Sequence, residues 1–398
     1  MSGKLQMKGS VFALAAFITF GASQAYADSG SPSPEQLLKL IQKQQRQIEE
    51  LQQMLTKTQT QSDKAIAAAE AAKSKAPDEG FLSKIQIGGV LEVEASSTSS
   101  FAGADSTDLT LAKVEFFLDA QPTNWVSTHV QLNIEDGSTN VNLDEAWVTI
   151  ANDKFTPLFL QAGQYAVPFS SDETGMVTDP LSYTLGETKE ANVLVGVNMV
   201  GFTAQGYVYN GDTQRAGGGN KVDQFGLFAG YEGEAAGAGY NLGIGYINSI
   251  SDSDTITDTL GGNAGALSRY IGGVAAHASV SFNNFALIGG YTTATEAFNS
   301  GQLAFNGNGA QPEAWYLEAN YTAQILKRDV TFALTYQGTD EALALGQPET
   351  RFGGTVSMEV VAGASLAAEY LHDEDYGTGD GGTGEDSHTA TLQLAVEF

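Results

Sequence analysis

The chain lacks cysteine altogether, and this excludes a disulfide framework, a thiolate metal cluster and a cysteine nucleophile. It is also poor in basic residues, with 19 Lys and Arg against 47 Asp and Glu. A surface of this charge repels phosphates, so we expect no nucleic-acid partner. Beyond residue 27, no apolar run approaches the ~18 residues that a membrane-spanning helix needs.

The first 27 residues have the three parts of a secretory signal peptide. Lys4 and Lys8 give a basic start, and the apolar run VFALAAFITFGA (11–22) is too short to be a typical membrane span. The small residues of AYA (25–27) complete a cleavage site. We therefore expect cleavage before Asp28 and an exported mature chain. The alternative is a buried N-terminal helix.

Residues 28–80 are expected to form a helical neck and linker. Ser33 and Pro34 provide a helix start. About three heptads follow, with a and d positions occupied by Leu37, Ile41, Gln44, Ile48, Leu51 and Leu55. This pattern predicts a short coiled coil suited to homo-oligomer formation, and a monomeric docked helix is the alternative. The Ala-rich continuation ends at Pro77 and Gly80, where we place the domain boundary.

From Ile85 onward, the period of the apolar residues changes from helical to two. In IQIGGVLEVEA (85–95) and WVSTHVQLNIE (125–135), apolar side chains alternate with charged and amide side chains. Roughly sixteen such segments of about 8–12 residues follow one another, a length that spans a bilayer when the strand is tilted. They lie at 84–96, 109–120, 125–135, 141–150, 157–166, 191–198, 201–210, 222–231, 239–249, 269–282, 285–294, 313–321, 329–337, 350–360, 364–372 and 389–398.

The connections between these segments alternate in length. Short ones such as 121–124, 283–284 and 361–363 alternate with long ones rich in Gly, Asp, Ser and Thr. Periplasmic turns and outer loops of outer-membrane barrels show this alternation. The sequence therefore predicts an all-β, transmembrane antiparallel barrel of about 16 strands over 81–398, preceded by the helical segment. A secreted sandwich or solenoid is the alternative.

The segment TATLQLAVEF (389–398) alternates between apolar and polar residues up to Phe398. In lipid every backbone polar group must be paired within the protein, so the last strand is expected to pair with the first. We expect the barrel to lie in the outer membrane of a Gram-negative cell, with the neck in the periplasm. Its expected partners are outer-membrane lipid, a small solute and, through the strand ending in Phe398, the barrel assembly machinery.

The residues offer little for catalysis. Only His129, His277, His372 and His388 are available as bases, and we expect them to be lumen or loop residues. Ser127 and His129 lie two residues apart on one strand, too far for direct proton transfer. No G-x-S-x-G or H-E-x-x-H motif occurs. We expect no enzyme activity and no cofactor.

The acidic segment DEDYGTGDGGTGEDSH (373–388) raises the question of a calcium site. Asp373, Asp375 and Asp380 are hard oxygen ligands, but their spacing does not fit an EF-hand. We expect a solvated acidic loop that keeps the outer surface soluble, and no metal site.

The longest connection, residues 166–190, differs from the others because it carries its own apolar residues. Met176, Leu181 and Leu185 are expected to pack on another part of the protein. In a wide barrel that part is the inner wall, and the loop would then constrict the pore. Its selecting side chains are expected to be Asp172, Glu173, Asp179 and Glu187. The alternative is an outer loop packed on a neighbouring protomer.

A sixteen-strand barrel is wide enough to hold an aqueous channel. We expect the pore to be lined by Lys113, Glu115, Gln131, Arg351 and Glu359, whose mixed charges would create a transverse field. The acidic excess disfavours a phosphate-selective pore, which needs rows of Lys or Arg. It favours cations, neutral solutes or metal chelates.

Three motifs carry a resemblance to a known family: GQYAVPF (163–169), MVTDPLSYTLGET (176–188) and GFTAQGYVYNGD (201–212). With them the chain resembles the LbtU-type siderophore porins of Gram-negative bacteria. Ser170 departs from the Gly that follows VPF in many porins. The resemblance implies passive uptake of a ferric siderophore without a plug. The alternatives are a sugar or general cation porin, and a non-transporting structural barrel that anchors the outer membrane.

Overall fold

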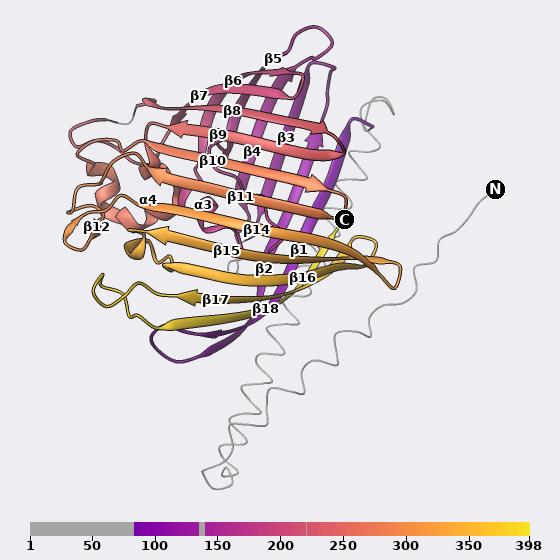
Figure 1. Cartoon of the computed structure of the whole chain (residues 1–398). Helices are drawn as coiled ribbons and strands as arrows, with labels where there is room; N and C mark the ends of the chain where they lie inside the picture. Colours follow the sequence, from indigo (N-terminus) through magenta and orange to yellow (C-terminus); the bar gives the residue numbers. More distant parts are fainter. Residues whose placement is uncertain (1–82, 135–139, 220) are drawn as a thin grey trace, which may run out of the picture. The chain divides into compact units, whose positions relative to one another are not determined.

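The structure is a computed structural model that describes residues 83–134, 140–219 and 221–398. The expected signal peptide (1–27) and nearly all of the neck and linker (28–80) lie outside the described residues. Within the described part, sixteen strands form one closed barrel (Figure 1). Among the described residues, no helix combines the length and the apolar character that a membrane crossing requires.

Each barrel strand is antiparallel to both of its neighbours, and β1 closes the ring by pairing with β18. This confirms the predicted fold class and strand number. The barrel strands are β1 (Ile85–Ser99), β2 (Ser106–Ala120), β3 (Val126–Asn133), β4 (Asn142–Ala151), β5 (Leu158–Ala166), β6 (Lys189–Met199), β7 (Phe202–Asn210), β8 (Gln224–Ala235), β9 (Ala238–Ile247), β10 (Gly273–Phe282), β11 (Phe285–Ala294), β14 (Glu313–Ile325), β15 (Arg328–Asp340), β16 (Thr350–Val361), β17 (Ala364–Glu374) and β18 (Asp386–Glu397).

Alternation along the strands separates an apolar outside from a polar inside. In β18, Leu392 and Leu394 point outward and are 55% and 40% exposed, while Thr391 and Gln393 point to the lumen. Large apolar side chains are exposed in this way around the ring. In water such a surface would be strongly unfavourable, whereas hydrocarbon accommodates it. The outside of the barrel therefore has the surface of a membrane-embedded protein.

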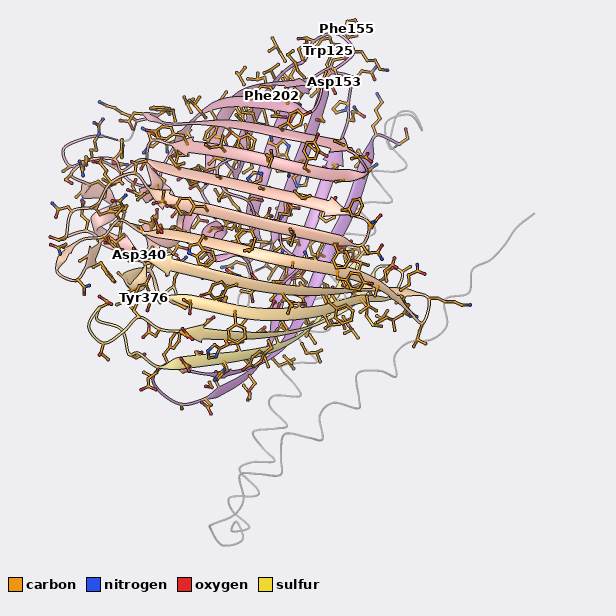
Figure 2. All side chains as sticks on the ribbon, viewed as in Figure 1. Trp125, Asp153, Phe155, Phe202, Asp340 and Tyr376 are labelled. Atoms are coloured by element: carbon orange, nitrogen blue, oxygen red, sulfur yellow. The ribbon has the colours of Figure 1, made fainter. Side chains whose placement is uncertain are left out.

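Aromatic side chains mark the end of the barrel that carries the short turns. Trp125, Phe155 and Phe202 gather there, and the rings of Trp125 and Phe155 stack with centroids 5.5 Å apart (Figure 2). All three are exposed. Amphipathic and aromatic rings prefer the interface between lipid and water. This end is therefore suited to one membrane interface.

The opposite end carries the long connections, which fold into short elements of their own. Residue 166 is followed by the inward loop (167–188), which contains helix α3 (Leu181–Gly186). The connection between β9 and β10 contains η1 (Ile250–Asp252), α4 (Asp254–Leu260) and η2 (Gly261–Ala266). Beyond β11 lie β12 (Ala304–Phe305) and β13 (Asn308–Gly309), which pair with each other, and η3 (Leu343–Leu345) follows β15.

Three bulges interrupt the regular pairing of the strands. The register shifts between Glu92 and Glu94, between Gln131 and Leu132, and between Glu359 and Val361. A bulge puts an extra residue on one strand and breaks the period-two alternation at that point. The predicted strand spans fall within or close to the observed ones, but these local breaks were not predicted.

Candidate functional site in the barrel lumen

The inward loop crosses the barrel and binds the wall far from its own ends. It begins after β5 and ends at β6, yet it forms hydrogen bonds with residues of β14, β15, β16 and β17. The main anchors are the lumen-facing side chains of Glu318, Gln337 and Glu369. The loop therefore lies inside the barrel against its inner wall.

Glu369 of β17 holds the middle of the inward loop. Its carboxylate accepts hydrogen bonds from the backbone N–H of Val177 at 2.6 Å and of Thr178 at 3.2 Å. The Thr178 hydroxyl donates a third at 2.6 Å, and the Thr355 hydroxyl of β16 a fourth at 3.0 Å. Glu369 is only 4% exposed. A buried carboxylate of this kind is satisfied only while the loop stays in place.

Glu318 of β14 holds the preceding turn in the same way. It accepts hydrogen bonds from the Thr174 hydroxyl at 2.5 Å and from the Gly175 N–H at 2.6 Å. The neighbouring Tyr316 donates its hydroxyl to the backbone oxygen of Glu173 at 2.6 Å. Gln337 of β15 then accepts from the N–H of Leu181 at 2.8 Å, at the start of α3. Strands β14, β15 and β17 thus fix the loop through its backbone groups.

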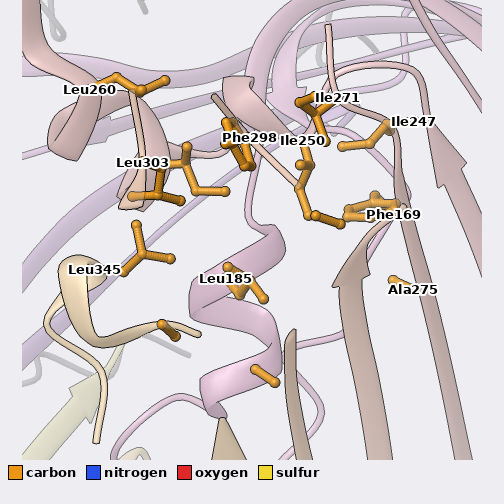
Figure 3. Packing of buried hydrophobic residues seen from close by; sticks show 14 of the residues in the cluster. Phe169, Leu185, Ile247, Ile250, Leu260, Ile271, Ala275, Phe298, Leu303 and Leu345 are labelled. Carbon is orange, nitrogen blue, oxygen red and sulfur yellow. The ribbon is translucent and has the colours of Figure 1, made fainter. Parts of the chain in front are cut away.

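Apolar packing completes the attachment. Leu181 and Leu185 of the loop are 3% and 0% exposed, and Met176 is 9% exposed. Leu185 points from α3 toward a cluster that includes Phe298 and Leu303 from the outer connections (Figure 3). The apolar residues that suggested a packed loop are therefore buried within the barrel and its outer connections.

Gly245 of β9 permits the close approach of the loop at its N-terminal end. A Cβ atom at this position would lie 2.6 Å from the backbone oxygen of Phe169. Any larger residue would force the loop away from the wall. Phe169 itself is 1% exposed and belongs to the cluster of Figure 3.

The acidic side chains of the loop are less buried than its apolar ones. Asp172 and Asp179 are exposed, and Glu187 is partly buried and accepts a hydrogen bond from the Tyr183 hydroxyl at 3.1 Å. Asp179 is exposed to the lumen but surrounded by the barrel wall. This partial removal from water raises the pKa of its carboxyl group, and the negative charges of Glu187 and Asp172 raise it further, against the opposing effect of Lys113. The loop therefore presents a concentrated negative charge that Lys113 partly offsets.

The part of the wall formed by β18, β1, β2 and β3 carries a second set of polar side chains. Lys113 and Glu115 of β2 form an ion pair of 3.7 Å, and the Lys113 side chain remains 46% exposed. Gln393 of β18 donates to Glu94 of β1 at 2.9 Å. The exposure of the Lys113 side chain contrasts with the near-complete burial of Glu318 and Glu369 beneath the loop. The lumen therefore has a covered wall on one side and a solvent-accessible charged wall on another.

The other predicted lining residues lie in different parts of the lumen. Gln131 donates to Asp144 at 3.1 Å, and Lys189 pairs with the same carboxylate at 2.8 Å. Arg351, at the loop end of β16, is engaged in two hydrogen bonds to Asp373 at 2.7 and 2.9 Å. The predicted lining residues Lys113, Glu115, Gln131, Arg351 and Glu359 therefore do not form one cluster. The positive charge of Arg351 is balanced by the carboxylate of Asp373.

Glu359 is at the opposite end of β16 from Arg351. Its carboxylate accepts a hydrogen bond from the N–H of Gly363 in a short turn, at 3.0 Å. Arg351 and Glu359 are thus separated by most of the strand. The transverse field expected from Lys113, Glu115, Arg351 and Glu359 together stays a prediction.

Sequence reasoning missed the anchoring residues Glu318, Gln337 and Glu369, together with Asp144 and Lys189 of the network near the loop end. The only signal for the anchors was a polar residue on the lumen side of a strand, which many lumen positions share. Asp144 was not predicted as a lumen residue because the bulge at Gln131 and Leu132 interrupts the alternation of the strand. The bulge lets Asp144 contact the lumen side chain of Gln131.

The histidines lie on both faces of the barrel. His129 faces the lumen, where its Nδ1 atom is 2.7 Å from a carboxylate oxygen of Asp119, and His277 faces the lumen on β10. His372 and His388 are directly paired on β17 and β18 and point outward with Tyr370. The expectation that all four are lumen or loop residues is therefore wrong for this pair, because register and alternation place them on the outer face.

The chain is similar to bacterial proteins that carry the name UPF0422. It is 27% identical over 304 residues to a UPF0422 protein of Coxiella burnetii, covering 74% of this chain and 65% of that protein. It is 26% identical over 355 residues to a UPF0422 protein of Legionella pneumophila strain Lens, covering 79% of this chain and 66% of that protein. The chain thus spans just under two thirds of the length of these relatives. No family model matches it.

Solved structures with the same fold are outer-membrane porins. An anion-selective porin from Comamonas acidovorans matches 79% of this chain and 99% of its own length, with a TM-score of 0.57 and 12% identity. The OprB structure of Pseudomonas putida at high pH matches 80% of this chain and 96% of its own, with a TM-score of 0.54 and 13% identity. The outer membrane channel DcaP of Acinetobacter baumannii matches 79% and 97%, with a TM-score of 0.53 and 14% identity. The described part of the chain has the fold of Gram-negative outer-membrane porins.

Proposed function

We propose that the protein is a passive outer-membrane channel for small solutes, with a constriction formed by the inward loop. The observation that carries the proposal is the contrast between the two sides of the lumen. Glu318 and Glu369 are 1% and 4% exposed under the loop, whereas the Lys113 side chain on the other side is 46% exposed. Water therefore reaches the space between the loop and the wall formed by β18, β1, β2 and β3.

The charges that border this space favour cations and neutral solutes. Asp172, Asp179 and Glu187 come from the loop, and Glu94 and Glu115 come from the wall. Against them stands Lys113, and Arg351 is already paired with Asp373. Rings of carboxylates select cations in pores. The porin from Comamonas acidovorans, which has a similar fold, is anion-selective. We do not extend anion selectivity to this chain, because the charge that borders its lumen is mainly negative.

A ferric siderophore is the solute that the three sequence motifs imply. Within our proposal, the acidic lumen favours a neutral or cationic chelate over an anionic one. A sugar or general cation porin is the second candidate, and it has the same requirement for an open, hydrated lumen. A structural barrel that anchors the outer membrane is the third, and it requires the lumen to be closed.

Uptake into liposomes tests the channel and separates these candidates. Liposomes containing the purified mature protein are mixed with neutral sugars of increasing size, and with matched ferric hydroxamate complexes of positive and negative charge. We expect entry of the small sugars and faster entry of the cationic chelate than of the anionic one. Entry of sugars with exclusion of both chelates would favour the sugar porin. Exclusion of every solute, in liposomes shown to contain folded protein, would contradict the channel.

The neck and the assembly signal remain proposals. Residues 28–80 would form a periplasmic coiled coil that joins copies of the chain, and Phe398 would present the last strand to the assembly machinery. Crosslinking of the mature protein with and without residues 28–80 tests the first. The fraction of Phe398→Ala protein that reaches the outer membrane tests the second.

A further inference from the structure

Four ionisable side chains meet on the outer face of β17 and β18, at the end that carries the long connections. His372 is the direct register partner of His388, and Glu374 is the direct partner of Asp386. Register partners in an antiparallel pair share a face, and so do residues two apart on one strand. The opposite face of β17 carries Glu369, which binds the inward loop. The four residues therefore form one group on the outer face of the barrel, outside the permeation path.

The spacing within this group suits a metal ion. Candidate ligand atoms of His372, Glu374 and Asp386 all lie within 4.8 Å of one another. The Nε2 atom of His372 is 3.7 Å from the Oε1 atom of Glu374. Ligand atoms at Zn–N and Zn–O distances of about 2.0–2.2 Å are roughly 3.3–3.5 Å apart in a tetrahedral site. Small side-chain rotations would bring the three ligand atoms to that separation.

Neighbouring groups hold the ligands in place. The Nδ1 atom of His372 is 3.0 Å from Nδ1 of His388, and the Tyr370 hydroxyl is 2.8 Å from the same atom of His388. On the other side, the Thr350 hydroxyl donates to Oε2 of Glu374 at 2.9 Å. A metal-binding histidine usually donates its second ring N–H to such a partner, which fixes the tautomer and the ring orientation. Here that arrangement leaves Nε2 of His372 and Oε1 of Glu374 directed at each other.

A positive charge between its members would stabilise this arrangement. A neutral His372 that donates its Nδ1 proton to His388 presents the Nε2 lone pair toward Glu374. Within the described part of the chain, the carboxylate of Asp386 has no hydrogen-bond or ion-pair partner of its own. A lone pair and two carboxylates repel one another unless a cation or a proton lies between them. Imidazole nitrogen is a good ligand for Zn²⁺ and its neighbours, whereas Ca²⁺ and Mg²⁺ prefer all-oxygen sites.

We propose that His372, Glu374 and Asp386 bind a divalent transition-metal ion of the Zn²⁺ type, with water completing its coordination. His388 and Thr350 are positioning residues. The ion joins the loop ends of β17 and β18, beside the strand that closes the barrel. This site departs from the sequence-based expectation of no metal, because only the strand register brings the four residues together. It does not depend on the proposed channel function.

Metal titration of the purified protein tests the site. Tag-free mature protein, folded in detergent and stripped with a chelator, is titrated with Zn²⁺ by calorimetry and with Co²⁺ by visible absorption. We expect one high-affinity site per chain and a Co²⁺ spectrum of low coordination number. His372→Ala should abolish that site, and Glu374→Gln and Asp386→Asn should each weaken binding more than tenfold. His388→Ala should weaken it by about 10–100-fold, the usual effect of losing an orienting partner.

The matched control is Glu385→Gln, which removes an adjacent carboxylate that is not a proposed ligand. It should leave the Zn²⁺ affinity and the Co²⁺ spectrum unchanged. Every variant should keep the heat-modifiable electrophoretic shift of the wild-type barrel, which verifies the fold without reference to channel activity. Absence of saturable binding in the wild type would overturn the proposal. So would equal affinity in wild type and His372→Ala, or equal losses in Glu374→Gln and the Glu385→Gln control.

Discussion

Gly89 and Phe398 exchange two backbone hydrogen bonds, from the N–H of Gly89 at 3.0 Å and from the N–H of Phe398 at 3.1 Å. The ring of Phe398 also covers Gly89, since a Cβ atom on Gly89 would lie 2.6 Å from the ring and 2.8 Å from the backbone oxygen of Glu115. These contacts lie at the seam where β18 meets β1. Backbone pairing with β1 therefore continues one residue beyond the end of β18, to Phe398.

Gly89→Val should weaken this seam. The added side chain collides with the Phe398 ring and with the β2 backbone, and overpacking of this kind costs about 1–3 kcal/mol. We expect a lower urea midpoint for the folded barrel in detergent, measured by the heat-modifiable shift in electrophoretic mobility. Gly379→Ala is the control, because a Cβ atom there meets nothing within 4 Å. Equal midpoints for both variants would show that the seam tolerates the added bulk.

Glu369→Ala should release the inward loop. The N–H groups of Val177 and Thr178 lose their acceptor, and each buried donor left unpaired costs about 1–3 kcal/mol. We expect a larger and noisier single-channel conductance. Glu359→Gln is the control, since this lumen glutamate bonds a turn residue and not the loop. An unchanged conductance in Glu369→Ala would mean that the remaining anchors suffice or that the loop does not limit the current.

Lys113→Gln should increase the preference for cations. Lys113 is the exposed basic residue that faces the acidic loop across the lumen, and its charge opposes that of Asp179. Its removal should raise the cation-to-anion permeability ratio about twofold at moderate salt, where screening limits the effect of a single charge. The reversal potential in a KCl gradient measures this ratio. Asp179→Asn should shift the same potential in the opposite direction, and shifts of the same sign would contradict this placement of the charges.

The outer connections should be more stable at mildly acidic pH. Burial raises the pKa of Asp252 to about 6, against the opposing hydrogen bonds from Thr213. Burial likewise raises the pKa of Asp254 to about 6, with a further contribution from Glu187. Because these values exceed the usual value of 3.8, the folded state binds protons more tightly than the unfolded state. Stability must therefore fall as the pH rises from about 4 to 6, and the destabilisation is complete above about 6.

Thermal unfolding at pH 5.0 and 7.5 tests this sign. We expect a higher midpoint at pH 5.0, where the free energy of unfolding should be greater by on the order of 1 kcal/mol. Asp252→Asn should reduce the difference between the two pH values, because the side chain no longer titrates. A higher midpoint at pH 7.5 in the wild type, or an undiminished difference in Asp252→Asn, would contradict the assignment.

The sequence predicted the strands because lipid on one side and water on the other impose a strict period of two. Leu392 and Leu394 against Thr391 and Gln393 show this pattern without ambiguity. It also indicated that residues 166–190 pack on something, because their apolar side chains are too many for a solvated loop. It did not reveal which wall they pack on, since Glu318 and Glu369 lie 143 and 191 residues from their partners Gly175 and Thr178.

Strand register explains the remaining differences between prediction and structure. The sequence predicted Arg351 as a charged lining residue, and in the structure the pairing of β16 with β17 places Asp373 beside it. Nothing in the sequence connected His372 with His388, which the pairing of β17 with β18 places side by side on the outer face. A bulge then placed Asp144 within reach of Gln131. Each of these contacts joins residues on two neighbouring strands. The sequence of one strand does not determine which residues of the next strand lie opposite its own.

Planar-bilayer recording of the purified mature protein tests the central claim most directly. The account predicts stepwise openings of uniform size and a reversal potential, in a KCl gradient, on the cation-selective side. Asp172→Asn, Asp179→Asn and Glu187→Gln together should move that potential toward zero. A bilayer that stays closed at all voltages, with folded protein present, would contradict the account, and so would a wild-type channel that selects anions.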